Sequence, residues 1–566
     1  MYVPVRAIVA TMAIATVGAA HDGDNACTHG HSPHQTAVLQ SVSAYGGLAG
    51  AVEVGGHDHA GGGSCVTPAG RVRMQEAMRA YAQRFGPFES SPHTRGGVPP
   101  YPIHPVGARE WQDLIMYNYV DLDLSEGSVQ DWNCGGYTYD GHNGVDALIS
   151  TFDHQLVGVP VTAVLDGTVT YVHDGEPDQN TEWDPDSVSN SVCIHHGGDL
   201  YTWYYHLKNG SVSVEMYQEV RAGEQISLVA SSGYSSWPHL HFETRRYTGD
   251  APDDWDGPEG TTVEPYAGSC NPGGSMWANQ VGIPSGATCR QFGTTTTNLD
   301  EFFASGVYQW RPPLSGAITT NHTQLWMWTQ ATDIGPFSTY QMRFYDPSGS
   351  LNYDSGTLWL NFSWDTYRMG TFWFSWDLPG LHSIPGTWTV DVVVNGDPYI
   401  NFPLEVLDSG ETHPNRIPEH ISADIGPIDA TADDLLTCRV DSSAVADLDW
   451  DLVRYRYTWR IGDRVLRDVV SAGRADHLPR VEGCDGAVIK CTVVPSDGMD
   501  QGAPVIAAIR LAGNSAVDIN CDGSIDIGDL LIILSEFGPC SLCGGDFDLD
   551  GDVDINDVLM LLSNWE

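Results

Sequence analysis

The six residues at 238–243 read Pro-His-Leu-His-Phe-Glu. If this stretch is a β-strand, His239 and His241 point to the same side, because successive side chains alternate between the two faces of a strand. Leu240 and Phe242 then face the opposite side. Two imidazoles on one face provide half of a zinc site, although a lone His-x-His pair also fits two packed histidines.

Two upstream segments carry groups of the same kind. Residues 141–146 read Gly-His-Asn-Gly-Val-Asp, and residues 204–207 read Tyr-Tyr-His-Leu. The glycines at 141 and 144 argue against a helix, so a strand-and-turn placement puts His142 and Asp146 on one side. A neutral imidazole and a carboxylate suit Zn²⁺, and three protein ligands with an open fourth position are the catalytic pattern. His206 lies at the end of an aromatic strand, and this position is compatible with a histidine packed in the core or with a functional one.

In combination, these segments resemble the M23 zinc peptidases, the lysostaphin/LytM-type endopeptidases. That family shows His-x-Gly-x-Asp, a Gly-rich hairpin, Tyr-x-His-Leu and Pro-His-Leu-His-Phe-Glu in this order, and residues 105–290 contain all four. The runs at 220–226, 231–235 and 263–266 also match. Ala230 and Trp237 replace glycines that are usual in the family, and Cys134, Cys193 and Cys270 are extra.

The resemblance implies a β-rich zinc metalloendopeptidase domain. His142, Asp146 and His241 would hold Zn²⁺, while His206 and His239 would serve as general base and acid, with the assignment between them open. The substrate implied first is a peptide crosslink of peptidoglycan. A Gly-rich extracellular protein such as elastin is an alternative, and so is a non-catalytic scaffold or glycan-binding anchor.

A tandem repeat at residues 514–566 predicts two Ca²⁺ loops, because oxygen ligands recur at positions 1, 3, 5, 9 and 12 with a glycine at position 6. The predicted ligands are Asp518, Asn520, Asp522, Asp526 and Asp529 in the first loop, and Asp546, Asp548, Asp550, Asp554 and Asp557 in the second. Each loop leads into an apolar helix, at 530–534 and 558–562. The two units resemble a dockerin, which implies docking to a cohesin-like partner or to the cell surface. Cys540 and Cys543 are candidates for a disulfide.

The remaining segments predict a mostly β, multidomain chain of 566 residues. Residues 1–20 read as a signal peptide, which implies secretion and makes disulfides plausible. Residues 21–104 form a His- and Gly-rich propeptide or linker with one helix near Arg71–Arg84. An alternative gives this segment a latency role, with Cys27, His57 or His59 capping the metal.

Two β-sandwich domains are expected at 300–407 and 411–510. In the first, the many Trp and Phe residues are read as sandwich core, with an exposed sugar-binding platform as the alternative. In the second, Cys438, Trp459 and Cys491 follow the order of an immunoglobulin-like core, with a disulfide covered by a tryptophan.

The charge balance excludes some partners. The chain has 73 Asp and Glu against 26 Lys and Arg, a net charge of −47. So acidic a surface repels nucleic acid and anionic lipid, and neither is expected as a partner. No apolar stretch reaches the ~20 residues of a membrane-spanning helix. We therefore expect a secreted, extracellular protein, with association to the cell surface through the C-terminal module.

Overall fold

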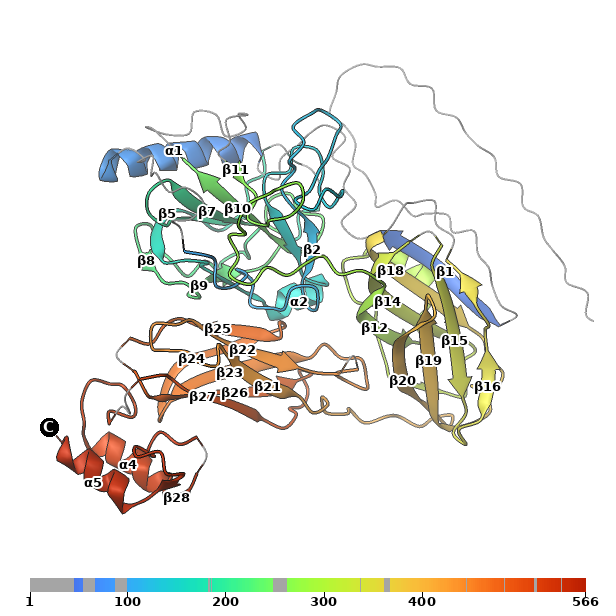
Figure 1. The fold of residues 1–566 in the computed structure, drawn as a ribbon. Coiled ribbons are helices and arrows are strands. Elements are labelled where there is room, and N and C mark those ends of the chain that lie inside the picture. The colour runs from blue at the N-terminus through green and yellow to red at the C-terminus, as the bar shows by residue number, and fades with distance from the viewer. Residues whose placement is uncertain are drawn as a thin grey trace, which may run out of the picture. The chain divides into compact units, whose positions relative to one another are not determined.

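The computed structural model describes residues 45–53, 67–86, 99–181, 184, 186–247, 262–335, 337–360, 367–443, 445–482, 484–513, 517–540 and 542–565. The predicted signal peptide and Cys27, His57 and His59 lie outside these residues. Strands make up 38% of the structure and helices 10%, which confirms the mostly β prediction (Figure 1).

One antiparallel sheet carries all three histidine motifs. Its strands run in the order β2-β3-β10-β7-β6-β5-β8, and β11 pairs with β10. The elements of this region are β2 (Ile115–Asn118), β3 (Val145–Leu148), α2 (Phe152–Val157), β4 (Pro160–Thr162), β5 (Gly167–His173), β6 (Ser191–His195), β7 (Leu200–Tyr205), β8 (Glu219–Val220), β9 (Gln225–Leu228), β10 (His239–Arg246) and β11 (Thr262–Val263). Strands β4 and β9 form a separate ladder.

Both faces of this sheet are buried, which explains why β7 is aromatic or apolar along nearly its whole length. On one face Tyr204 and Phe242 belong to the main apolar core. On the other face Tyr201, Trp203 and Tyr205 pack in a second cluster together with Met74 and Met78 of helix α1 (Pro68–Phe85). The sheet is therefore the middle layer of its domain.

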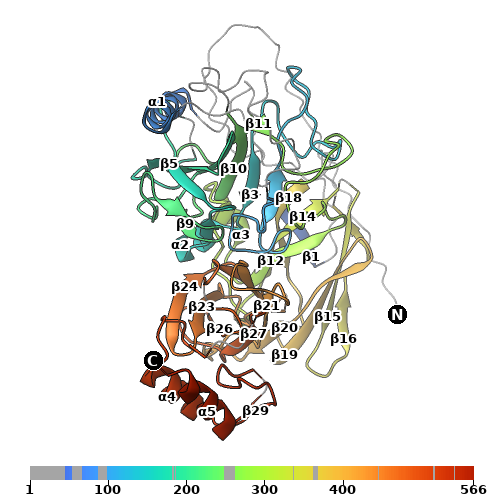
Figure 2. The ribbon, with the colours of Figure 1, turned by 60° about the vertical axis from the view of Figure 1, so that its left-hand side comes forward.

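Helix α1 confirms the helix predicted near Arg71–Arg84. The Thr67 side chain caps its first turn by accepting a hydrogen bond from the Gly70 N–H at 3.2 Å. Met74 and Met78 lie four residues apart and so project from one face of the helix. Although α1 lies within the stretch predicted as propeptide or linker, it covers the sheet that bears the histidines (Figure 2).

The next unit consists of two sheets. One has the order β1-β18-β14-β12, and the other has β13-β20-β19-β15-β16 with β17 on β15. Strand β1 pairs with β18 along its length, so the first strand of this unit also comes from the predicted propeptide or linker. The elements are β1 (Gly46–Glu53), β12 (Thr288–Thr295), α3 (Leu299–Phe303), β13 (Ala317–Thr319), β14 (Leu325–Ile334), β15 (Thr339–Tyr345), β16 (Leu351–Asp354), β17 (Leu358–Trp359), β18 (Tyr367–Trp376), β19 (Gly386–Val394) and β20 (Asp397–Leu407).

Most tryptophans of this unit are core residues, in agreement with the first interpretation of its composition. Those buried to 4% exposure or less are Trp326, Trp328, Trp373, Trp376 and Trp388. Trp359 is half exposed, at 49%. An aromatic platform would need several exposed rings, whereas most of these rings fill the interior.

The third unit also has two sheets, in the orders β21-β22-β25 and β24-β23-β26-β27. Cys438 and Cys491 lie in its core, and Trp459 of β23 stands opposite Cys491 of β26. The two sulfurs form no bond in the structure, so the predicted disulfide is not observed. The strands are β21 (Ser422–Gly426), β22 (Leu436–Asp441), β23 (Arg454–Ile461), β24 (Arg464–Ser471), β25 (Ala475–Leu478), β26 (Val488–Ser496) and β27 (Val505–Arg510).

The C-terminal module is helical, as predicted. It contains α4 (Ile527–Ser535), α5 (Ile555–Ser563) and a two-stranded ladder of β28 (Gly538–Pro539) and β29 (Asp552–Val553). Cys540 and Cys543 form the expected disulfide, and a second disulfide joins Cys134 to Cys270.

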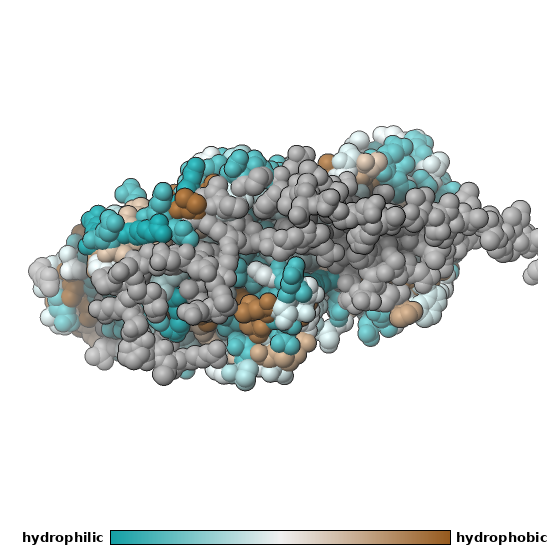
Figure 3. Space-filling view, turned by 90° about the horizontal axis from the view of Figure 1, so that it is seen from above, coloured by the Kyte–Doolittle hydropathy of each residue, from teal (hydrophilic) through white to brown (hydrophobic). Residues whose placement is uncertain are grey.

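The face shown in Figure 3 is mostly hydrophilic where residues are described, with separate hydrophobic patches. Among the described residues, no helix combines the length and the apolar character that crossing a membrane requires.

The packing of α1 yields a stability prediction. We expect Met78→Ala to lower the free energy of local opening of α1 by about 2–5 kcal/mol, because it leaves a cavity beneath a fully buried side chain. Amide hydrogen exchange along residues 68–85 measures this change. Glu76→Ala, at an exposed position of the same helix, is the control and should change it by less than about 0.5 kcal/mol. Equal exchange in both variants would contradict the packing role of α1.

Candidate metal centre

Strand register brings the histidine motifs together. Strand β10 pairs antiparallel with β3 so that His241 stands opposite Asp146. On its other side β10 pairs with β7, which sets His241 opposite Tyr205 and places His206 at the end of that strand. Residues separated by 95 positions in sequence thus become direct neighbours.

Three side chains converge tightly. His241 Nδ1 lies 2.8 Å from Asp146 Oδ1, and His142 Nε2 lies 3.2 Å from Asp146 Oδ2. The two histidine nitrogens are 3.2 Å apart. All three side chains are buried, and their ligand atoms lie close enough together to hold one metal ion. The structure therefore brings His142, Asp146 and His241 into the arrangement that the sequence predicts.

The outer hydrogen bonds of the two histidines fix which nitrogen faces the centre. His142 Nδ1 donates to the Tyr119 carbonyl at 2.7 Å, since a carbonyl can only accept. His241 Nε2 donates in the same way to Glu243 Oε1 at 3.1 Å. The opposite nitrogen of each neutral ring then presents its lone pair to Asp146. Two lone pairs and a carboxylate directed at one point repel each other unless a cation lies between them.

His206 and His239 lie beside these three groups. Their ring centroids are 4.5 Å apart, and His239 Nε2 lies 3.6 Å from Asp146 Oδ1. His206 Nδ1 donates to the Ser232 carbonyl at 2.7 Å, and His239 Nδ1 donates to the Trp237 carbonyl at 2.8 Å. In each neutral ring Nε2 is therefore the nitrogen that can take up a proton. His206 has φ 59°, an uncommon value for a side chain of this size.

Gly144, between His142 and Asp146, occupies a position that has no room for a larger side chain. A Cβ atom at this position would lie 2.7 Å from His241 Nε2 and 2.8 Å from the Phe242 carbonyl oxygen. Any larger residue would therefore displace the strand that carries His241. The glycine permits the close approach of β10 that the metal centre requires.

Two further polar residues were not singled out from the sequence. Glu243 orients His241, and its place two residues further on the same strand face is a signal that period-2 reasoning could have used. Asn118 donates from Nδ2 to Asp146 Oδ2 at 2.8 Å. No sequence pattern marks Asn118, because its partner lies 28 positions away on another strand.

The electrostatics favour an anionic centre. Burial opposes the charged form of Asp146, but the adjacent imidazoles of His142, His239 and His241 outweigh burial and hold its pKa well below its usual range. Burial likewise opposes ionisation of Glu243, yet Arg245 at 2.7 Å overcomes it and lowers the Glu243 pKa to about 2. Both carboxylates are therefore charged at neutral pH, which suits cation binding.

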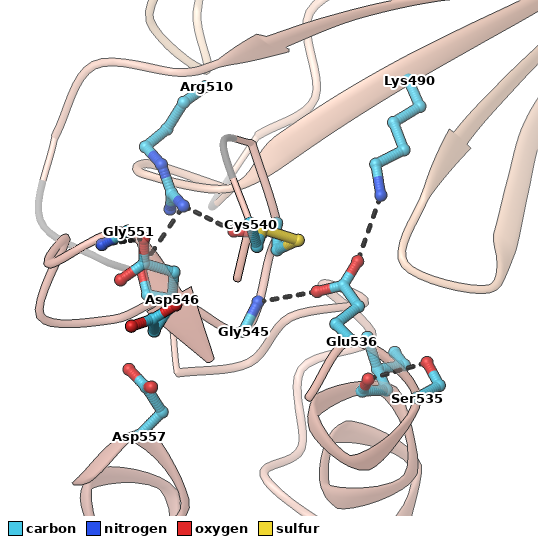
Figure 4. The surroundings of a disulfide bond; sticks show 12 residues. Lys490, Arg510, Ser535, Glu536, Cys540, Gly545, Asp546, Gly551 and Asp557 are labelled. Atoms are coloured by element: carbon cyan, nitrogen blue, oxygen red, sulfur yellow. Dashed lines mark hydrogen bonds and ion pairs between the residues drawn. A yellow bond between two sulfur atoms is a disulfide. The ribbon is translucent and has the colours of Figure 1, made fainter. Parts of the chain in front are cut away.

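The C-terminal loops form a second acidic group. The side chains of Asp546, Asp548 and Asp550 lie within ligand distance of one common point. Figure 4 shows Asp546 and Asp557 facing the same space, and Asp557 is fully buried. In both repeats the residues at positions 9 and 12 form a capping box, with Asp526 and Asp529 at the start of α4 and their counterparts at α5. The repeated loops thus have equivalent geometry.

Comparison with known proteins identifies the region that contains the histidines. Residues 140–254 match Peptidase family M23. The chain carries an M23 peptidase domain. The match includes His142, Asp146, His206, His239 and His241.

Several relatives that match the M23 domain have peptidase names. The chain is 33% identical over 102 residues to an uncharacterized metalloprotease of Haemophilus influenzae, covering 18% of each protein. It is 32% identical over 109 residues to the DD-carboxypeptidase/endopeptidase Mpg of Neisseria meningitidis serogroup B, covering 19% of this chain and 21% of that protein. It is 32% identical over 103 residues to the glycyl-glycine endopeptidase ALE-1 of Staphylococcus capitis, covering 18% and 24%. The similarity thus spans less than a quarter of each relative.

The buried carboxyl group of Glu264, in the same domain as the candidate metal centre, should make the stability of the fold depend on pH. Glu264 accepts hydrogen bonds from the Val120 N–H at 3.0 Å and the Tyr266 N–H at 2.7 Å. Burial raises its pKa to about 8, from an ordinary value of 4.5. Between these pH values the folded chain keeps a proton that the unfolded chain has lost. The stabilisation is complete below pH 4.5 and is lost as the pH rises toward 8.

We therefore expect Glu264→Gln to flatten the decline in unfolding free energy between pH 5 and 8, as measured by urea unfolding at several pH values. Glu110, whose pKa burial raises to about 7, adds a decline that persists in the variant. Glu126→Gln, at an exposed position, is the control and should keep the wild-type slope. Identical slopes in both variants would refute this account of Glu264.

Proposed function

We propose that this chain is a secreted zinc metalloendopeptidase that hydrolyses peptide crosslinks of peptidoglycan. The proposal depends on one observation: the lone pairs of His142 and His241 converge on the Asp146 carboxylate, with His206 and His239 beside them. Two imidazoles and one carboxylate are a usual ligand set of catalytic zinc. The presence of all five side chains argues against a non-catalytic scaffold.

The chain's own residues can perform the proton transfers of hydrolysis. His142, Asp146 and His241 would hold Zn²⁺, which would supply Lewis acidity for the hydrolysis of a peptide bond. One of His206 and His239 takes the water proton at Nε2. The other, when it is protonated at Nε2, donates from Nε2 to the developing oxyanion or protonates the leaving amine. Their Nδ1 hydrogen bonds to backbone carbonyls hold each ring in position for these roles.

The names of the relatives favour cell-wall peptides as substrate. One relative is named a DD-carboxypeptidase/endopeptidase and another a glycyl-glycine endopeptidase. Slim, flexible peptides fit a centre formed on buried strands, because little space surrounds the histidines. A Gly-rich extracellular protein such as elastin remains the second substrate class. The signal-like residues 1–20 support secretion.

For the C-terminal module we propose Ca²⁺ binding and docking to a cohesin-like partner or to the cell surface. Asp546 Oδ1 is buried and has no hydrogen-bond partner among the described residues, as expected for an oxygen that binds a cation. Apolar side chains on and next to α4 and α5 are exposed, which is typical of a surface that binds another protein. They include Ile527, Leu531, Leu534, Phe537, Ile555, Leu559 and Leu562.

Digestion of purified peptidoglycan and of elastin, with fragments identified by mass spectrometry, tests the function. We expect new amino termini from peptidoglycan peptides, loss of cleavage after a zinc chelator, and recovery on adding Zn²⁺. Cleavage of elastin alone would replace the substrate assignment. Cleavage that persists in metal-free protein would exclude the zinc mechanism.

Two variants separate metal binding from proton transfer in the same assay. His241→Ala should lose both zinc and activity, whereas His239→Ala should keep zinc and lose about 10²- to 10⁴-fold in kcat. His173→Ala, which removes a histidine paired with Glu176 elsewhere in the domain, is the matched control. Full activity with full zinc content in both site variants would disprove the assigned roles.

Calorimetric titration of the full chain with Ca²⁺ tests the C-terminal loops. We expect two bound ions, and one after Asp546→Ala, because this substitution removes the first ligand of the second loop. Asp552→Ala should keep both ions, since only the backbone carbonyl of that residue would contact Ca²⁺. Unchanged stoichiometry in Asp546→Ala would rule out the second site.

A further inference from the structure

Arg368, in strand β18 of the first sandwich, reaches the strand that supports the metal centre. Its Nη1 donates to the Asn118 side-chain oxygen at 2.8 Å and to the Tyr117 carbonyl at 3.2 Å. Its Nη2 donates to the carbonyls of Thr138, at 3.2 Å, and Gly136. One guanidinium group of a neighbouring unit therefore binds both β2 and the segment that precedes His142.

The contact with Arg368 fixes the orientation of Asn118. A guanidinium group can only donate, so the Asn118 oxygen must face Arg368. The Asn118 amide nitrogen must then face Asp146, where it donates to Oδ2 at 2.8 Å. Asn118 and Asp146 are both buried, and this strengthens hydrogen bonds that are fully formed. The chain of contacts Arg368–Asn118–Asp146 thus controls the direction of one carboxylate oxygen.

The same guanidinium group also supports the second ligand. Thr138, whose carbonyl Arg368 binds, donates from its hydroxyl to the Tyr119 carbonyl at 2.7 Å. That carbonyl also accepts the hydrogen bond from His142 Nδ1. A displacement of residues 136–138 would therefore change the ring orientation of His142.

Packing around Arg368 makes it a firm anchor. Its neighbour Met369 is fully buried and lies with Trp373 in the same apolar cluster as Tyr117 and Ile149. The guanidinium carbon lies 5.6 Å from the Tyr117 ring centre and 5.2 Å from that of Tyr137. Cation–π contacts of this kind add to the hydrogen bonds and favour arginine over lysine.

We propose that Arg368 is a positioning residue for the metal centre, acting through Asn118 on Asp146 and through Thr138 on His142. The first sandwich would thus complete the peptidase site rather than merely follow it in the chain. The inference rests on the proposed zinc site, but it does not require that any substrate be cleaved.

The experiment measures the metal site itself in the full chain, with excess Ca²⁺ present to occupy the C-terminal loops. Zinc affinity comes from competition with a chelator, and the visible absorption of the Co²⁺-substituted protein reports coordination geometry. We expect Arg368→Ala to weaken zinc binding about 10- to 100-fold and to alter the Co²⁺ spectrum. Asn118→Ala removes one of the two routes, so it should weaken zinc binding less than Arg368→Ala does, and the double variant should lose less than the sum of the two single losses.

Two further variants complete the design. Arg368→Lys keeps the charge and the aliphatic stem but cannot form the paired hydrogen bonds, so it should also weaken zinc binding, and it decides the question if Arg368→Ala fails to fold. Arg343→Ala removes an arginine of the same sandwich that pairs with Asp354, and it should retain wild-type zinc affinity and spectrum.

Wild-type zinc affinity and Co²⁺ spectrum in folded Arg368→Ala or Arg368→Lys would overturn the inference while leaving the proposed peptidase intact. A wild-type protein that binds zinc but cleaves neither peptidoglycan nor elastin would instead overturn the proposed function alone. A wild-type protein that binds neither metal at this centre would overturn both.

Discussion

The pairing of β10 with β3 is the constraint on which the metal centre depends. Its register sets His241 opposite Asp146, while β7 on the other side brings His206 to the same place. Because strand side chains alternate, a slip of one residue would turn Phe242 toward Asp146 and bury His241 in the apolar core. The register is specified because Leu240 and Phe242 pack into the main apolar core on the other face. The same hydrophobic pattern that folds the sheet therefore assembles the ligands.

Charge is buried around this sheet only where a partner compensates it. Asp146 lies among histidines, and the fully buried Glu243 pairs with the equally buried Arg245. Removing one member of such a pair leaves an uncompensated charge, so these positions tolerate little change. In a chain with 26 basic and 73 acidic residues, Arg245 and Arg368 each contact a side chain that is hydrogen-bonded to a proposed metal ligand. These two arginine side chains therefore contribute to the geometry of the centre.

The units are joined by segments that are distant in sequence. Strand β1 pairs Gly46 with Trp376, and α1 covers β7 although more than a hundred residues separate them. Such contacts close long loops, which costs conformational entropy that the contacts must offset. Residues 45–53 and 67–86 therefore gain their structure from the two β units they join. The polar, Gly-rich sequence on either side of these residues favours a propeptide or linker, and that assignment stays a prediction.

The sequence by itself determined the local chemistry. Strand periodicity places His239 and His241 on one face, and the glycines argue against a helix around His142. The spaced aspartates mark two loops, each followed by a helix. These features depend on neighbours within a few residues, so pattern and propensity suffice to find them. The tertiary structure alone decided that Asn118 donates to Asp146, that Arg368 donates to Asn118, and that β1 and α1 pack on distant sheets. Each of these contacts joins residues far apart in sequence through packing and register, and no local pattern encodes such a pair.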